Sequence, residues 1–113
     1  MNNISPQLQN QIAQFQQVQQ QLQATGSQKL QMEAQRKEME RTLAELEKAS
    51  GDIYQNVGSL MIKVEDKTAV KTEITDAMET MEVRIKSMDR QEKSLREKFE
   101  SLQESINREM GQK

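Results

Sequence analysis

Residues 53–64, IYQNVGSLMIKV, contain two short runs rich in β-branched and aromatic residues on either side of Gly58-Ser59. Such runs are typical of β-strands, and Gly at the first central position of a two-residue loop suits a type II′ turn. The segment therefore predicts a β-hairpin in which Val57 faces Leu60. A plain loop between two helices is the alternative, although loops are seldom this apolar.

The segment before the hairpin is typical of one long helix, over about residues 5–50. Ser5 can cap its N-terminus, and Pro6 suits the first helical position because its missing N–H is not needed there. Gly51 suits the left-handed position after the helix. Gly26 lies inside the helix at a cost of about 1 kcal/mol relative to Ala, and is either a tolerated defect or a hinge. The apolar stripe of this helix comprises Leu8, Ile12, Phe15, Val18, Leu22, Met32, Met39, Leu43 and Leu46.

The segment after the hairpin predicts a second helix over about residues 66–110, capped by Asp66 or Thr68 and stopped by Gly111. Its apolar residues follow a regular heptad rhythm, at Ile74, Met78, Met81, Ile85, Met88, Leu95, Phe99, Leu102 and Ile106. Four pairs of acidic and basic residues at i, i+4 spacing support it, namely Glu82–Lys86, Asp89–Lys93, Glu92–Arg96 and Glu104–Arg108.

A short hairpin returns the chain beside itself, so the two helices are expected to pair as a long antiparallel coiled coil, a single domain over residues 1–113. Leu22 then lies near Leu95, and Phe15 near Leu102. Each helix is about 65 Å long at 1.5 Å per residue, with both termini at the far tip. The predicted fold class is thus α-dominated, with one central hairpin. Polar residues weaken the middle of the first helix's stripe, namely Thr25, Lys29 and Arg36.

Composition excludes several classes of protein. Leu, Ile, Val and Phe number 22 of 113 residues, too few for an independent globular core but enough for two narrow stripes. The absence of His and Cys removes disulfides, the usual zinc and haem ligands and the common nucleophile pairs. Four glycines, none in a phosphate-loop context, and acidic residues on solvated helix faces argue against an enzyme. No cofactor, metal, nucleic acid or membrane span is expected, nor a secretory signal at the start.

The hairpin poses an energetic problem that predicts assembly. An isolated two-stranded hairpin is marginal in water, and its open edges are templates for pairing with other chains. A thin coiled coil cannot cover it, so several hairpins are expected to join in one intersubunit sheet or barrel. The predicted assembly residues are Ile53, Tyr54, Val57, Gly58, Leu60, Met61, Ile62 and Val64.

The opposite end predicts a binding surface. Residues 1–28 carry no charge, and Gln dominates the flanks of the first helix there. Helix ends fray, and an uncharged amphipathic end can contact another protein without desolvating charges. The alternative is an ordinary seam with a Gln-rich solvated face. The residues predicted to contact another protein, called the tip residues below, are Leu8, Ile12, Phe15, Leu102, Ile106 and Met110.

The whole arrangement resembles the beta class of prefoldin subunits, of archaeal type. The resemblance is carried by SPQLQ at residues 5–9, by IYQNVGSLMIK at 53–63 and by RQEKSL at 90–95. The Tyr-x-x-Val-Gly segment, followed by an apolar strand ending in Lys, is the most distinctive part. One hairpin rather than two is similar to the beta class and unlike the alpha class.

The resemblance implies a hexamer of two alpha-class and four beta-class subunits whose hairpins build a joint β-barrel. It implies a cytoplasmic chaperone that holds non-native proteins at the tips without ATP and passes them to a group II chaperonin. A passive coiled-coil scaffold, which forms an oligomer without holding clients, is the alternative.

Overall fold

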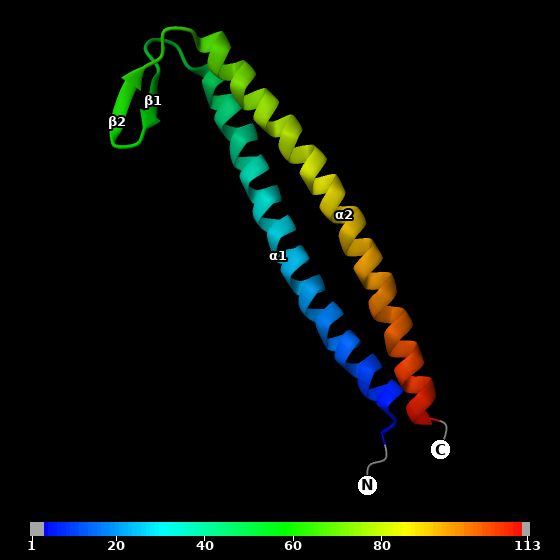
Figure 1. Cartoon of the computed structure of the whole chain (residues 1–113). Helices are drawn as coiled ribbons and strands as arrows, with labels where there is room; N and C mark the ends of the chain where they lie inside the picture. The colour runs from blue at the N-terminus through cyan, green and yellow to red at the C-terminus, as the bar shows by residue number, and fades with distance from the viewer. Residues whose placement is uncertain (1–3, 112–113) are drawn as a thin grey trace. The chain divides into compact units, whose positions relative to one another are not determined.

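The computed structural model describes residues 4–111 and contains two long helices joined by a β-hairpin (Figure 1). The elements are α1 (Pro6–Lys48), β1 (Tyr54–Val57), β2 (Leu60–Lys63) and α2 (Lys67–Gly111). The predicted order of helix, hairpin and helix is confirmed, and each helix ends within two residues of its expected position.

The chain divides into two compact units. One, the terminal unit, comprises Met1–Leu30 and Lys86–Lys113; the other, the hairpin unit, comprises Gln31–Ile85. Each unit therefore contains a segment of α1 and a segment of α2, and the hairpin belongs entirely to the second. The two units are described separately below.

Side chains cap both helix starts. The Ser5 hydroxyl accepts a hydrogen bond from the backbone N–H of Leu8 at 3.1 Å, which satisfies one of the free donors of the first turn. Asp66 does the same for α2, because its Oδ1 accepts from the N–H of Thr68 at 3.0 Å and of Ala69 at 3.4 Å. Of the two predicted caps for α2, Asp66 is therefore the one used.

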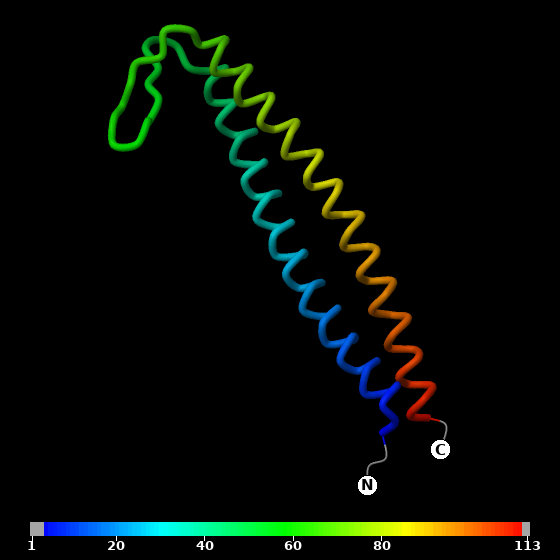
Figure 2. Tube along the Cα trace, in the orientation of Figure 1, coloured from blue at the N-terminus to red at the C-terminus, as the bar shows by residue number. Residues whose placement is uncertain are grey.

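The hairpin has the predicted register. β1 and β2 are antiparallel with Val57 opposite Leu60 and Gln55 opposite Ile62, and the N–H of Val64 donates to the carbonyl of Ile53 at 2.8 Å. Figure 2 shows the chain turning back between the two strands. Gly58, the first central residue of the turn, has a φ of 62°, whereas Ser59, the second, does not have a positive φ. This combination identifies the turn as the expected type II′, because a type I′ turn needs a positive φ at both positions.

In the terminal unit, α1 and α2 run antiparallel and pack their apolar stripes against each other, with the residues of α2 half-buried at most (Figure 1). Val18 is the best covered apolar residue, at 2% exposed, and Leu8 is 8% exposed. The rings of Phe15 and Phe99 stack with centroids 4.6 Å apart. The aromatic partner of Phe15 thus lies about one turn along α2 from Leu102, the neighbour expected from the hairpin register.

The polar residues of the α1 stripe are compensated across the helix pair. Lys29 Nζ contacts Asp89 Oδ1 at 2.7 Å and Glu92 Oε1 at 2.9 Å. In the hairpin unit, Arg36 donates to Glu82 Oε1 at 3.0 and 3.2 Å. Glu82 and Asp89, which were expected to pair along α2 with Lys86 and Lys93, therefore pair across the helices with Arg36 and Lys29 instead. Glu92–Arg96 and Glu104–Arg108 form as expected.

Gly26 lies within the unbroken helix α1, on the side that faces α2. A Cβ built at this position would lie 3.4 Å from Glu92 Oε2, the carboxylate that also binds Lys29. The glycine therefore leaves room for the Glu92 side chain beside α1. This packing reason for a glycine differs from both sequence-based interpretations, a tolerated defect and a hinge.

Candidate assembly and binding surfaces

The hairpin exposes its apolar residues. Five of them are roughly half to three-quarters accessible, namely Tyr54, Val57, Leu60, Met61 and Ile62. Ile53 and Val64, at the base of the hairpin, are half-buried. Because the strands pair in the register given above, Ile53, Val57, Leu60, Ile62 and Val64 share one face of the sheet, and Tyr54 and Met61 lie on the other. Five of the predicted assembly residues therefore share a largely apolar face, which also carries Gln55 and whose outer part is uncovered.

Both edges of the hairpin are open among residues 4–111, because the sheet there has only two strands. The bond between Val64 and Ile53 identifies the hydrogen-bonded pairs, which alternate with non-bonded pairs along an antiparallel ladder. The backbone groups of Tyr54 and Asn56 therefore point away from the ladder on one edge, and those of Met61 and Lys63 do so on the other. These are the groups that an added strand would use.

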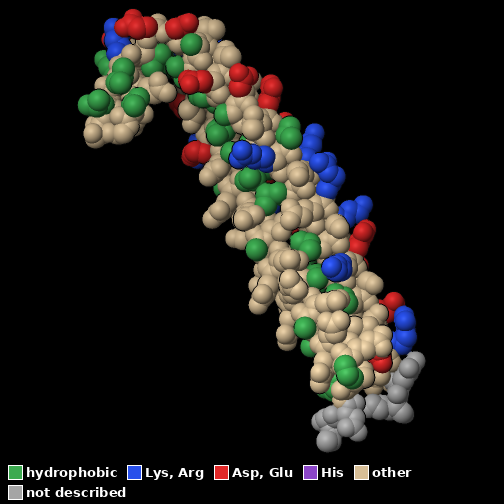
Figure 3. Space-filling view, in the orientation of Figure 1, with side chains coloured by type: hydrophobic (Ala, Val, Ile, Leu, Met, Phe, Trp, Pro, Cys, Tyr) green, Lys and Arg blue, Asp and Glu red, His purple; other side chains and the backbone are tan. Residues whose placement is uncertain are grey.

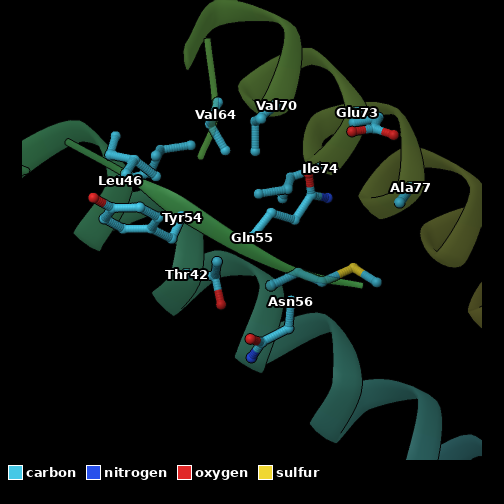
Figure 4. Close-up of a pocket in the computed structure, with 12 residues that line it drawn as sticks. Thr42, Leu46, Tyr54, Gln55, Asn56, Val64, Val70, Glu73, Ile74 and Ala77 are labelled. Atoms are coloured by element: carbon cyan, nitrogen blue, oxygen red, sulfur yellow. The ribbon is translucent and has the colours of Figure 1, made fainter. Parts of the chain in front are cut away.

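An apolar groove of about 560 Å³ separates β1 from the helices in the hairpin unit. Leu46 of α1, Ile74 of α2 and Tyr54 of β1 are among the residues that line it (Figure 4). In this view Tyr54 projects toward α1 on the side of Leu46, and Gln55 points toward Ile74. The inner edge of β1 therefore faces space that the chain itself leaves unfilled.

The tip residues are covered to different degrees. Leu8 is buried, and Ile12, Phe15, Leu102 and Ile106 are half-buried between the helices. Met110 alone is well exposed, at 55%. The structure thus brings five of the six together in the helix seam, where most of their surface is already covered.

A groove beside this seam gives access to part of the cluster. It has a volume of about 360 Å³, and Ile12, Phe15 and Ile106 form its apolar floor. Its walls carry amide side chains that sequence analysis did not single out: Gln16, Gln19, Gln103 and Asn107. The signal that could have located them is their spacing, since each lies one, three or four positions from a seam residue on the same helix.

The terminal unit contains an ion cluster in which Lys29 of α1 contacts two carboxylates of α2. Hydrogen bonding to the Asp89 carboxylate, followed by that to Glu92, raises the pKa of the Lys29 ammonium above its ordinary value. The side chain is 23% exposed and Glu92 is 17% exposed, so this pair is better shielded from water than the other ion pairs of the described chain. It joins α1 to α2 within the terminal unit.

Residues 4–111 contain no group of three or more acidic residues placed to hold a metal ion. In the same range, no helix is both long enough and apolar enough to cross a membrane. The two features that require an explanation are the uncovered hairpin and the uncharged groove.

Comparison with known proteins gives a consistent result. The family model described as "Prefoldin subunit" matches residues 9–113. The chain is 46% identical to prefoldin subunit beta of Methanosarcina acetivorans, over 99% of this chain and 97% of that one. It is 44% identical to prefoldin subunit beta of Methanospirillum hungatei, over 97% and 92%. The crystal structure of the prefoldin beta subunit from Thermococcus strain KS-1 superposes with a TM-score of 0.83 at 36% identity, covering 95% of each chain.

Proposed function

This chain belongs to the prefoldin family, in its beta class, and from that premise we propose that it is an ATP-independent holding subunit. Membership implies a chaperone type of function, in a family that is not enzymatic, and a hetero-oligomer with alpha subunits. The finer proposal is that the tip residues and the adjoining groove bind non-native proteins, which then pass to a group II chaperonin in the cytoplasm. The observation that carries it is the uncharged groove with an apolar floor of Ile12, Phe15 and Ile106.

The hairpin is proposed as the assembly element. Its outer apolar residues are uncovered, and both of its edges carry free backbone groups. Burial of apolar surface stabilises by about 25 cal/mol per Å², and strand pairing satisfies the edge groups at the same time. A joint β-barrel in a hexamer of two alpha and four beta subunits accomplishes both.

The groove is proposed as the place where holding occurs because it combines access with a lack of charge. The buried seam residue Leu8 is not accessible without separation of the helices, whereas Ile12, Phe15 and Ile106 are partly open to the groove. Met110 adds an exposed, flexible side chain that adapts to different apolar groups. A client would thus be bound without desolvation of a charge.

A test uses the hetero-oligomer reconstituted from this chain and an alpha-class subunit. It should suppress the aggregation of an unfolded model protein, measured by light scattering, without ATP. Deletion of residues 1–16 together with 102–113 should abolish this protection. The oligomer should stay intact, so that its mass falls only by the mass of the deleted residues. Equal protection by the truncated form would refute the tip assignment.

A pair of point variants sharpens the test. Ile106→Asp places a charge on the groove floor, and Gln14→Asp places the same charge on an exposed position of α1 outside the groove. We expect only the first to reduce protection, because a charge desolvated by an apolar client is unfavourable.

A passive scaffold is the second candidate. The observation in its favour is that five of the six tip residues are already packed in the seam. An oligomer that assembles normally and never delays aggregation would establish the scaffold and reject the holding subunit.

A further inference from the structure

The walls of the terminal-unit groove carry only amide side chains. Gln16 and Gln19 come from α1, and Gln103 and Asn107 from α2, on either side of the apolar floor. All four residues are exposed. In a site for a purely apolar ligand, apolar side chains would be expected on these walls as well as on the floor. In a site for a charged ligand, Lys, Arg, Asp or Glu would be expected there.

The same chemistry extends along α1. Of fourteen exposed residues between positions 7 and 28, eleven are Gln or Asn, and the others are Ala or Ser. Charged residues are common on α2 in the same unit. Figure 3 shows the contrast, because charged side chains follow α2 there while α1 over residues 6–28 has none. Uncharged exposed residues are therefore general along α1 in this unit, whereas on α2 the wall amides Gln103 and Asn107 belong to a helix that also carries charges.

Amide side chains match one ligand in particular, the polypeptide backbone. Each Gln or Asn offers both N–H donors and a carbonyl acceptor. An extended chain presents N–H and C=O groups at each residue with a rise of about 3.3 Å. Ile12 to Gln19 spans about 10 Å of helix at 1.5 Å per residue, so the groove matches about three extended residues.

We propose that this groove recognises an extended, non-native segment through its backbone, with the amides of Gln16, Gln19, Gln103 and Asn107 bonding its N–H and C=O groups. Apolar side chains of the segment rest on Ile12, Phe15 and Ile106. This inference rests on the proposed holding function and adds the chemical feature that the groove recognises, namely the backbone N–H and C=O groups of the bound segment. Native proteins pair nearly all of their backbone groups, so unpaired ones distinguish a non-native chain whatever its sequence.

The test replaces wall amides by a side chain of similar shape that forms no such hydrogen bonds. Gln16→Met, Gln19→Met and Gln103→Met are combined in one variant. The matched control combines Gln14→Met, Gln17→Met and Gln21→Met, three exposed positions outside the groove. Met is as good a helix former as Gln, and unchanged thermal melts followed by circular dichroism would verify that both variants fold.

Each variant is assembled with an alpha-class subunit and titrated with a labelled, uncharged heptapeptide of alternating Val and Thr. A second peptide carries N-methyl groups on alternate backbone nitrogens, which removes those donors. We expect the wild-type and control oligomers to lose at least about fivefold in affinity on N-methylation, as the loss of a neutral hydrogen bond requires. The groove variant should bind the unmethylated peptide about as weakly as wild type binds the methylated one. N-methylation of the peptide should then cause no further loss of affinity in this variant.

Opposite results would overturn the inference. A groove variant that binds the unmethylated peptide as tightly as wild type, or more tightly, would make the groove merely apolar. If N-methylation weakened peptide binding equally in all three oligomers, the peptide backbone would be recognised outside the groove. The same would follow if the wild-type oligomer protected an unfolded protein but bound neither peptide. A wild-type oligomer that protects no unfolded protein would instead reject the proposed function itself.

Discussion

The hairpin and the tip residues are the two apolar regions that the sequence predicts as binding surfaces, yet the structure treats them differently. Val57, Leu60 and Met61 of the hairpin are 52%, 63% and 71% exposed. At the tip, Leu8 is 8% exposed and Phe15 is stacked on Phe99. The two regions differ in exposure because only one of them has a packing partner within the chain. Helix α2 covers the stripe of α1, whereas nothing in residues 4–111 covers the outer face of the hairpin.

The comparison teaches that the two surfaces should respond to different perturbations. A surface without an internal partner depends on other subunits, so a single charge there should affect assembly. A surface with an internal partner depends on the helix pair, so perturbations of the seam should affect local stability and access to the groove. Four predictions follow this division, in descending order of effect.

The largest effect is expected from Val57→Asp. The charge would lie on the apolar face of the hairpin and be buried on assembly, so subunits should remain largely dissociated in native mass spectrometry with an alpha-class partner. Asn56→Asp is the control, because Asn56 neighbours Val57 but lies on the other face. An intact hetero-oligomer with Val57→Asp would contradict the assignment of this face to the interface.

Phe99→Ala tests the seam of the terminal unit. Loss of the ring that stacks on Phe15 should destabilise the helix pair by about 2 kcal/mol, less than a fully buried Phe because the site is half-buried. Chemical denaturation of the assembled oligomer measures this. Client protection should fall, since the floor of the groove contains Phe15. Increased protection would instead mean that clients bind to separated helices.

Lys29→Met tests the ion cluster between the helices. It removes the partner of Asp89 and Glu92 and should lower the melting temperature by a few degrees at neutral pH. Because the folded-state pKa of Lys29 is raised, its stabilisation is complete below the unfolded pKa of about 10.4 and is lost as pH rises through the higher folded value. The difference between wild type and variant should therefore be constant from pH 7 to 9.

The smallest effect is expected from Gly26→Ala. The change gains up to about 1 kcal/mol of helix propensity, and the added Cβ meets only the flexible end of Glu92, at 3.4 Å. A slight rise in the melting temperature is therefore expected, with assembly unchanged. A fall would show that the Glu92 carboxylate needs the room beside Gly26 to bind Lys29.

Local sequence signals located the elements and their ends with little error. Ser5-Pro6 and Asp66 cap the helices, and Gly58 forms the type II′ turn. These features depend on neighbours in the chain, so the residues that determine them are adjacent in the sequence. The hairpin register follows for the same reason, because a two-residue turn leaves only one pairing of the flanking strands.

The candidate site was predicted only in part. Periodicity assigned Ile12, Phe15 and Ile106 to the seam, and these residues form the groove floor. The amide walls were not singled out, because which flank of a seam opens into a groove depends on how the two helices meet. The ion pairs differ for the same reason. Glu82 and Asp89 had basic neighbours along α2 at i, i+4 spacing, but Arg36 and Lys29 lie across the seam and bind them instead.

The amino-acid sequence by itself determined two helices, one hairpin, an apolar stripe on each helix and an uncharged first quarter of the chain. Each is a property of composition or short-range spacing, and each requires only local geometry. Tertiary structure decided which apolar residues stay exposed, which charges pair and where a groove opens. These outcomes depend on contacts between residues distant in the sequence, where burial is shared between two helices or left without a partner.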